Sequence, residues 1–530
     1  MGITVGEALV QKLERAGFEV AFGIPGVHNL ELYRGLKRST IRHVAARHEQ
    51  GLGFMADGYA RAAGKPAVCF TITGPGLTNI ASAMGQALAD SIPMLVISTE
   101  NRRSEVGSRR GFLHEMPAQF AVGSSLARLS LRLETAEQLY GHFDQVMHAL
   151  THGRPGPVYL EIPRDVLSLE YDDPSRSSVQ PLVTEHNDRQ MATVEEWLVN
   201  AERPLLLVGG GAKGADVYKL AVHLDAPTVM TINARGAIPR GHRLGIPASP
   251  SLQSIRDLVA QADVVLALGT EFGQTDFDMY AVSEFQKPAR LIRVDIEQAQ
   301  LTRNVVPDIS VVADSRVWVS ALMNRLSDAQ RPHASWVAIA QAQLAAAWDE
   351  LTSPQRRQVQ FLEALTSAFD NPMIIGDSTQ PVYSGNLYFS PSSTGSWFNS
   401  ATGYGTLGYA LPASNGACLA NPSRTVICLT GDGGLQFTLS ELAVTRDEGI
   451  HPIVMVWNNQ SFKEIRHSML AVDIEPEGVD IRPPRLDKLA QAYDLDYRLI
   501  ASPADLVPLA KDYNSAPRAL LVEIIPGEME

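Results

Sequence analysis

The sequence predicts an α/β protein built from three doubly wound parallel-sheet domains, each with helices on both faces of its sheet. Short β-branched and apolar runs alternate with helical patterns along the chain, which favours parallel sheets. The length of 530 residues suits about three domains of roughly 150 to 200 residues each. A stretch rich in Ser, Asp and Pro at 165–190 is typical of a linker between two of them.

Composition and charge exclude several classes of function. Hydrophobic residues make up 45% of the chain and charged residues 19%, as in an ordinary globular protein with a large core. The net charge is −13 and no block of Lys or Arg stands out, which argues against a nucleic-acid surface. No apolar run reaches the ~18–20 residues that span a bilayer, and the N-terminus resembles an amphipathic helix rather than a signal peptide. We therefore expect a cytoplasmic protein without nucleic-acid or membrane partners.

The three cysteines do not form a metal site or a disulfide framework. Cys69, Cys418 and Cys428 lie inside apolar runs and lack the spacing of metal ligands. They are predicted to be buried, reduced thiols.

The first predicted domain covers residues 1–165 and the second covers residues 190–330. A helix is predicted at 51–63, directly after the segment that contains Glu49. The predicted strands of these two domains are 20–22, 44–46, 67–73, 94–99, 156–163, 205–208, 264–268 and 291–295.

The third predicted domain covers residues 355–530 and is reached through a helical bridge at about 330–355. Its clearest elements are the strand 425–430, the helix 439–448 and the strand 452–457.

The most informative stretch begins where the strand 425–430 stops at Gly431, Asp432, Gly433 and Gly434. Glycines at a strand end bring backbone N–H groups close to a phosphate, and an aspartate beside them can hold a hard divalent cation. The strand 452–457 ends in Asn458 and Asn459, whose amide oxygens suit the same metal. The alternative is an ordinary βαβ unit with turn residues at its strand ends.

The GDG turn, a 24-residue strand–helix–strand spacer and the Asn-Asn pair together resemble the motif of the thiamin-diphosphate-dependent enzyme superfamily. The resemblance implies thiamin diphosphate and Mg²⁺ as cofactors. It makes Asp432, Asn459 and the carbonyl of Ser461 the metal ligands, and it places the glycines 431, 433 and 434 at the diphosphate. The three-domain architecture of that superfamily covers nearly the whole chain.

Glu49 is the first candidate catalytic residue. It stands in Arg47-His48-Glu49-Gln50, followed by a glycine- and alanine-rich helix that ends in GYAR, and this stretch resembles the superfamily pattern closely. The resemblance implies that Glu49 is the carboxylic acid that faces the pyrimidine ring of the cofactor and activates it. The alternative is a surface acid at a strand end.

The segment 403–412 resembles the stretch that holds the aminopyrimidine in this superfamily. The implied roles fall on the carbonyl of Gly405 and on the side chain of Leu407, which stands where many relatives have methionine, a volume-conserving change. In the superfamily the cofactor lies between two subunits. The resemblance therefore implies a homodimer at least, and a homotetramer as the common assembly.

The overall pattern resembles the acetolactate-synthase-like branch, but the segment 111–117 differs from it. His114 stands where those enzymes carry an active-site glutamine, and a histidine near neutral pKa can move the proton that releases an aldehyde. His28 and its neighbour Val27 lie beside a position where relatives place active-site groups. Each histidine could instead be structural.

The central domain gives a weak cofactor signal. The glycines 209–211 follow a predicted strand, but the later segment that flavin-binding relatives carry is replaced by the shorter 245–250. A glycine-rich turn alone is more often just a turn. FAD is therefore a doubtful cofactor.

Several short segments resemble the 2-ketoarginine (5-guanidino-2-oxopentanoate) decarboxylases, among them 276–280 and the stretch around Glu464. An acid at Glu464 could pair with the guanidinium of a long substrate, or it could be a solvated surface acid. The predicted activity is decarboxylation of such a small-molecule 2-oxo acid. The alternatives are an acetolactate-synthase-like carboligase and, in a different class, a non-catalytic thiamin-fold protein.

Overall fold

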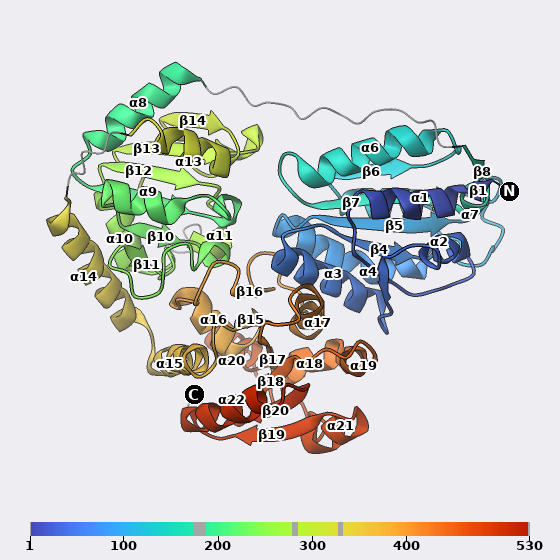
Figure 1. Cartoon of the computed structure of the whole chain (residues 1–530). Helices are drawn as coiled ribbons and strands as arrows, with labels where there is room; N and C mark the ends of the chain where they lie inside the picture. The colour runs from blue at the N-terminus through green and yellow to red at the C-terminus, as the bar shows by residue number, and fades with distance from the viewer. Residues whose placement is uncertain (1, 173–186, 278–284, 327–331, 528–530) are drawn as a thin grey trace.

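The structure, a computed structural model, describes residues 2–172, 187–277, 285–326 and 332–527, and contains three α/β domains. Figure 1 shows the N-terminal domain in blue and the central domain in green side by side, with the C-terminal domain in orange and red below them. Each domain has a six-stranded sheet in which all neighbouring strands are parallel. Helices cover both faces, as expected for a doubly wound fold.

The N-terminal sheet has the strand order β3-β2-β4-β5-β7-β6, and a short antiparallel pair, β1 with β8, lies apart from it. Its strands are β2 (Val20–Gly23), β3 (Arg42–Val44), β4 (Ala67–Thr71), β5 (Met94–Glu100), β6 (Leu129–Arg132) and β7 (Pro157–Pro163), and the pair is β1 (Ile3–Thr4) and β8 (Glu170–Tyr171). Its helices are α1 (Val5–Arg15), α2 (Leu30–Leu36), α3 (Glu49–Ala63), α4 (Pro75–Ala89), α5 (Gln119–Ser125), α6 (Gln138–Thr151) and α7 (Arg164–Leu167).

The central sheet has the order β11-β10-β9-β12-β13-β14, the order of a Rossmann fold. Its strands are β9 (Pro204–Val208), β10 (Thr228–Met230), β11 (Gly245–Ile246), β12 (Val264–Leu268), β13 (Arg290–Asp295) and β14 (Ile309–Val312). Its helices are α8 (Asp188–Val199), η1 (Gly210–Ala212), α9 (Val217–Leu224), η2 (Ile232–Ala234), α10 (Gln253–Gln261), α11 (Gln274–Phe277), η3 (Gln298–Gln300), α13 (Ser315–Met323) and α14 (Ala334–Glu350), the last of which packs against α10.

The C-terminal sheet has the order β16-β15-β17-β18-β20-β19. Its strands are β15 (Met373–Gly376), β16 (Trp397–Asn399), β17 (Val426–Gly431), β18 (Ile453–Trp457), β19 (Asp496–Ile500) and β20 (Leu520–Ile524). Its helices are α15 (Ser353–Ala368), α16 (Gln380–Leu387), α17 (Ala410–Ala420), α18 (Asp432–Phe437), η4 (Leu439–Glu441), α19 (Leu442–Asp447), α20 (Lys463–Ala471), α21 (Leu486–Ala492), η5 (Pro503–Asp505) and α22 (Leu506–Ser515).

The two outer domains share one topology. When the six strands of each sheet are numbered along the chain, both orders read 2-1-3-4-6-5. The domains meet through α3 and α17, which cross so closely that their backbones touch (Figure 1). A Cβ atom on Gly58 would overlap the backbone of Ala413, and one on Gly416 would overlap the carbonyl of Met55. Glycine is therefore required at both positions, and the crossing joins the outer domains into one core.

Among the elements that were predicted, boundaries differ at the turns after β3 and β17. The strand predicted at 44–46 ends at Val44, and α3 begins at Glu49 rather than at residue 51. Helix α18 begins at Asp432 itself, directly after the strand. Among the described residues, none of the helices combines the length and apolar character needed to cross a bilayer. All three cysteines are free and buried.

Candidate functional site

Two of the candidate segments, those of His28 and Asp432, follow strands at the places where the strand order of the outer sheets reverses. In an open parallel sheet, ligands bind beyond the carboxyl ends of the strands at such a reversal. In the C-terminal sheet it lies between β15 and β17, which end at Gly376 and Gly431. In the N-terminal sheet it lies between β2 and β4, which end at Gly23 and Thr71. The two outer sheets thus have equivalent reversal points, which we call the two crevices.

Asp432 occupies the crevice of the C-terminal sheet at the first turn of α18. Its side chain is 3% exposed, and its Oδ2 atom has no hydrogen-bond partner among the described residues. Burial raises the pKa of Asp432 to about 6, although nearby backbone N–H groups oppose the shift. A buried carboxylate oxygen without a partner suits a bound cation, which would supply the missing interaction.

Neighbouring side chains leave little room for a side chain at the two glycines after Asp432. A Cβ atom on Gly433 would overlap the ring of Phe462, and one on Gly434 would lie 3.2 Å from the carboxyl carbon of Asp377. Asp377 is fully buried after β15, and burial raises its pKa to about 6. The backbone of α18 therefore lies directly over a second buried carboxyl group.

Asn459 takes part in a chain of hydrogen bonds that leads to Glu464. Its Nδ2 donates to Oε1 of Gln380 at 3.1 Å, and Nε2 of Gln380 donates to Oε1 of Glu464 at 3.0 Å. The amide oxygen of Asn459 accepts a bond from the backbone N of Ser461 at 3.2 Å. Gln380 at the start of α16 was not predicted from the sequence. It links the expected metal ligand to the expected substrate-binding acid.

The oxygen atoms near Asp432 fit a hard divalent cation that binds through a single carboxylate. Among the described residues, no group of three His, Cys, Asp or Glu side chains is placed to hold a metal. A cation here would rely on Asp432 together with the amide oxygen of Asn459 and backbone carbonyls. Mg²⁺ accepts such a set when phosphate oxygens complete its shell.

The loop with Gly405 and Leu407 is held by the N-terminal domain of the same chain. Oγ1 of Thr406 donates to Oε1 of Gln86 at 3.0 Å, and Oγ1 of Thr402 donates to Asp90 at 2.9 Å. Gly405 has φ +74° and open space around it, and the side chain of Leu407 is half-buried. A backbone carbonyl and an apolar side chain are therefore accessible at this loop.

Glu49 is the first residue of α3 and is half-buried. Its Oε2 accepts a hydrogen bond from Nδ2 of Asn79 on α4 at 2.9 Å. Asn79 and Gln86 stand seven residues apart on α4, a separation of about 10 Å along a helix. Within one chain, Glu49 and the loop at Gly405 thus contact α4 about two turns apart.

His28 and His114 lie together beyond the carboxyl ends of β2 and β4. Their rings meet edge to face with centroids 5.3 Å apart. Nδ1 of His28 lies 2.8 Å from Oγ1 of Thr73, and its Nε2 has no partner among the described residues. Burial, with Arg164 and His114 nearby, lowers the pKa of His28 to about 4, so its ring is neutral at pH 7.

Apolar side chains beside these histidines face solvent in the single chain. Val27 is 65% exposed and Leu113 is 60% exposed. His114 itself has φ +61°, and its carbonyl approaches Gly74 so closely that a Cβ atom there would lie 2.5 Å from it. The backbone of His114 is therefore held against Gly74, while the neighbouring apolar side chains of Val27 and Leu113 are exposed to solvent in the single chain.

The glycines of the central domain are explained by packing. A Cβ atom on Gly209 would overlap the carbonyl of Gly269, and one on Gly211 would lie 3.0 Å from the Cα of Gly269. The turns after β9 and β12 thus press against each other. In the segment 276–280, Asp276 accepts a bond from the backbone N of Ile232 at 3.3 Å, and the other residues of interest there, including 278, lie outside the described residues.

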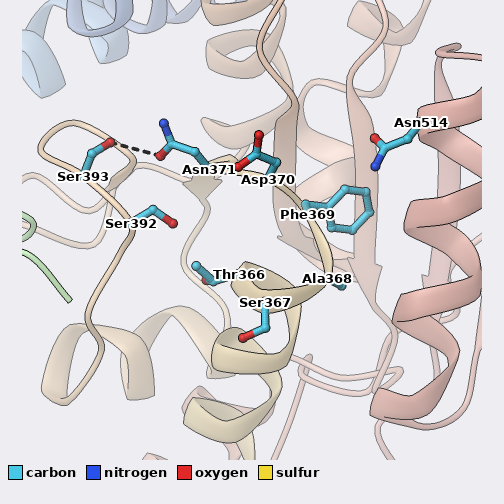
Figure 2. A pocket seen from close by; sticks show the side chains of 9 residues that line it. All are labelled: Thr366, Ser367, Ala368, Phe369, Asp370, Asn371, Ser392, Ser393 and Asn514. Carbon is cyan, nitrogen blue, oxygen red and sulfur yellow. Dashed lines mark hydrogen bonds between the residues drawn. The ribbon is translucent and has the colours of Figure 1, made fainter. Parts of the chain in front are cut away.

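A polar surface hollow of 590 Å³ lies away from these residues, at the end of α15. Figure 2 shows its lining side chains, which include Asp370, Asn371 and Ser393, with a hydrogen bond between the last two. It contains none of the predicted site residues, and it is open and lined by small polar groups. We therefore do not regard this hollow as the candidate active site.

Comparison with known families agrees with this geometry. A model of the N-terminal thiamine-pyrophosphate-binding domain of thiamine pyrophosphate enzymes matches residues 3–122. Models of the central domain and of the C-terminal thiamine-pyrophosphate-binding domain match residues 191–322 and 377–524. The chain belongs to the thiamin-diphosphate-dependent enzymes, and the two crevices lie in its thiamin-diphosphate-binding domains.

The chain is also similar to individual members of this family. The chain is 40% identical over 518 residues to a probable 2-ketoarginine decarboxylase of Pseudomonas aeruginosa, an alignment that covers 96% of this chain and 91% of that protein. It is 32% identical over 472 residues to the large subunit of acetolactate synthase isozyme 1 of Escherichia coli, covering 86% and 82%. It is 27% identical over 561 residues to a probable acetolactate synthase large subunit of Methanocaldococcus jannaschii, covering 98% and 92%.

Proposed function

We propose that the protein catalyses the Mg²⁺-dependent, non-oxidative decarboxylation of 5-guanidino-2-oxopentanoate to an aldehyde and carbon dioxide. The observation that supports it most directly is the hydrogen-bonded chain from Asn459 through Gln380 to Glu464. It connects an expected metal ligand, through one glutamine, to a carboxylate of the type that binds a guanidinium. The 40% identity to a probable 2-ketoarginine decarboxylase agrees with this substrate.

In this proposal, the residues at the two crevices have separate roles in binding the metal ion and the cofactor. Bound thiamin diphosphate supplies a carbon nucleophile that also accommodates the electron pair left when carbon dioxide departs. Asp432, Asn459 and the carbonyl of Ser461 would hold Mg²⁺, with the backbone at residues 431, 433 and 434 along the diphosphate. The carbonyl of Gly405 and the side chain of Leu407 would hold the pyrimidine ring, and Glu49 would hold the proton that activates it.

His114 and His28 are the candidates for proton transfer to and from the substrate. His28 is neutral at pH 7 because burial lowers its pKa to about 4. One of its ring nitrogens therefore donates a hydrogen bond and the other accepts one. Its unpartnered Nε2 atom provides the available hydrogen-bonding position. Val27 would border the substrate beside this pair.

We propose that two copies of the chain form each site. Within one chain Glu49 and the Gly405 loop bind different parts of α4. Exposed apolar side chains surround the candidate residues on both outer domains, a feature typical of surfaces that another chain covers. They include Val27, Leu113, Tyr404, Phe437, Ile465 and Val472. We propose a homodimer as the smallest active assembly and a homotetramer as the expected one.

A carboligase that joins the decarboxylated substrate to a second carbonyl compound is the second candidate. The 32% identity to the Escherichia coli acetolactate synthase subunit favours it. The two activities differ in whether the intermediate accepts a proton or a second carbonyl carbon, and the histidine pair favours the proton.

The test compares carbon dioxide release from 5-guanidino-2-oxopentanoate, pyruvate and the neutral 2-oxopentanoate, with thiamin diphosphate and Mg²⁺ present. We expect the guanidino substrate to be preferred and its aldehyde to be the product. Glu464→Gln should raise KM for the guanidino substrate by about tenfold or more, the loss of a charge-assisted pair, and leave KM for 2-oxopentanoate unchanged. Acetolactate from pyruvate as the main product would replace this proposal with the carboligase.

A further inference from the structure

A buried glutamate of the C-terminal domain contacts the start of helix α3. Glu441, the last residue of η4, is 0% exposed although it carries an ionisable side chain. Its Oε1 accepts hydrogen bonds from the backbone N of Arg47 at 3.1 Å and of His48 at 3.0 Å. Its Oε2 also lies 3.2 Å from the backbone N of Arg47. These two amides belong to the residues directly before Glu49.

The carboxylate of Glu441 completes the N-terminus of α3. The first N–H groups of a helix have no partners within it, and the dipole of the helix favours a negative charge there. His48 is the N-cap of α3, and its own ring accepts a bond only from the N of Gln50 at 3.1 Å. Glu441 therefore accepts from the amide of the N-cap His48, which the helix leaves free, and from the amide of Arg47 directly before it.

Two further contacts show that the position of Glu441 is specific. A Cβ atom on Gly51 would overlap the carboxyl group of Glu441, so the first turn of α3 has room for that group only because residue 51 is glycine. The backbone carbonyl of Glu441 accepts a bond from Nδ2 of Asn415 on α17 at 3.0 Å. The glutamate is thus fixed from both sides of the domain junction.

The ionisation of Glu441 reflects this environment. Burial raises the pKa of Glu441 to about 7, and the amides of Arg47 and His48 oppose the shift. Burial of an ionisable group costs free energy unless hydrogen bonds compensate for it. The amides of Arg47 and His48 provide hydrogen bonds to Glu441 here.

We propose that Glu441 is a positioning residue for Glu49: by capping α3 from the C-terminal domain, it fixes the direction in which Glu49 leaves the helix. The proposal rests on the role proposed above for Glu49. It also connects that role to the GDG segment, because η4 follows α18 after a single residue. Displacement of a catalytic group by about 1 Å can lower a rate by about a hundredfold.

The test uses the full-length protein and three variants: Glu441→Ala, Glu441→Gln and the control Glu448→Gln. Glu448 also joins the two domains, through a 2.6 Å ion pair with Arg42, and its side-chain hydrogen bonds among the described residues go to Arg42 and not to α3. The first measurement is deuterium exchange of the backbone amides at 47 and 48 in protein without cofactor. We expect at least about tenfold faster exchange in Glu441→Ala, a smaller increase in Glu441→Gln, and wild-type exchange in the control.

The second measurement is the rate at which the thiazolium C2 proton of bound thiamin diphosphate exchanges with deuterium. We expect Glu441→Ala to slow it by at least about tenfold, with Glu441→Gln intermediate because its amide oxygen keeps one acceptor. Wild-type C2 exchange in a variant whose amides at 47 and 48 have opened would overturn the proposal, as would unchanged amide exchange. If Glu441→Ala does not fold, Glu441→Gln decides both measurements.

A parallel sample separates this proposal from the one on which it rests. Glu49→Gln should abolish most of the C2 exchange while leaving the amides at 47 and 48 protected. If Glu49→Gln exchanges the C2 proton at the wild-type rate, the role of Glu49 itself fails. The amide measurement would then still report whether Glu441 caps α3.

Discussion

At the scale of single residues, burial raises the pKa of several carboxyl groups in the outer domains. The pKa is about 7 for Glu100 and Glu441, and about 6 for Asp377 and Asp432. Such pKa shifts are frequent at functional sites, because catalytic acids and bases need pKa values that match their task. They also reduce stability at neutral pH, because a buried carboxyl group must lose its proton there.

Glu100 gives a direct test of that cost. Its pKa is raised from 4.5 to about 7 by burial, so the stability it contributes is full below about pH 4.5 and is lost as the pH rises through about 7. Relative to wild type, Glu100→Gln should therefore gain on the order of 3 kcal/mol in stability between about pH 4.5 and pH 8. Urea denaturation of both proteins across this range measures the difference. A difference that does not change with pH would contradict the raised pKa.

Glu49→Gln tests the expected activator. Loss of the acid should lower kcat by about 10²- to 10⁴-fold, because the amide cannot transfer a proton. The hydrogen bond from Asn79 can persist, so the thermal unfolding temperature should stay within a few degrees of wild type. Steady-state kinetics and a melting curve provide both values. Turnover near the wild-type rate would exclude Glu49 as the activating acid.

The sequence identified the residues that carry recognisable motifs but not those that support them. Glu49, Asp432 and Asn459 were predicted because each stands at a fixed spacing within a motif. Gln380 and Glu441 were not, because their partners lie far away in the chain and no local pattern marks them. A glutamine after an unrecognised strand and a glutamate within a helical pattern look like ordinary polar positions.

At the scale of secondary-structure elements, the crossing of α3 and α17 joins the outer domains. Long, strongly apolar strands such as β4, β12 and β17 were predicted within one or two residues, because a buried parallel strand is a continuous apolar run. The strands β6, β10, β11, β14, β15, β16, β19 and β20 were not predicted. The start of α3 was placed two residues late: the helix begins at Glu49 after the N-cap His48, and Glu441 binds the amide of His48 from the other domain.

The crossing makes a specific prediction about stability. Gly58→Ala should destabilise the protein by about 2–3 kcal/mol, because the new Cβ atom would overlap the backbone of Ala413. Gly141 in α6 provides the matched control, since its Cβ position meets no atom within 4 Å. Gly141→Ala should be neutral or stabilise the helix by up to about 1 kcal/mol. Chemical denaturation compares the two, and equal effects would show that the helices can separate without cost.

At the scale of the whole molecule, the two thiamin-diphosphate-binding domains have one topology but carry complementary residues. The N-terminal domain carries Glu49 and the histidine pair, and the C-terminal domain carries Asp432 and Asn459. Within one chain, Glu49 and the loop at Gly405 contact residues about two turns apart on α4. The assembly of two copies is therefore the level at which we expect a complete site.

Mixed dimers test this expectation. Glu49→Gln and Asp432→Asn should each be inactive alone. After the two variants are unfolded together and refolded, a two-fold dimer with shared sites should recover about a quarter of wild-type activity, because half the dimers are mixed and one of their two sites is intact. Activity assays before and after mixing provide the comparison. No recovery, despite mixed dimers in sedimentation or mass measurements, would place each site within one chain.

The sequence by itself determined the class of the protein, because the thiamin motif, the parallel-strand pattern and the residues at strand ends depend on local spacing. It also determined which residue types stand at the two sheet edges. Only the tertiary structure decided that the outer domains share a strand order, that Gln380 connects Asn459 to Glu464, and that Glu441 caps the helix of Glu49. Those contacts join residues up to about 400 positions apart, and their formation depends on the packing of whole domains, which no local pattern encodes.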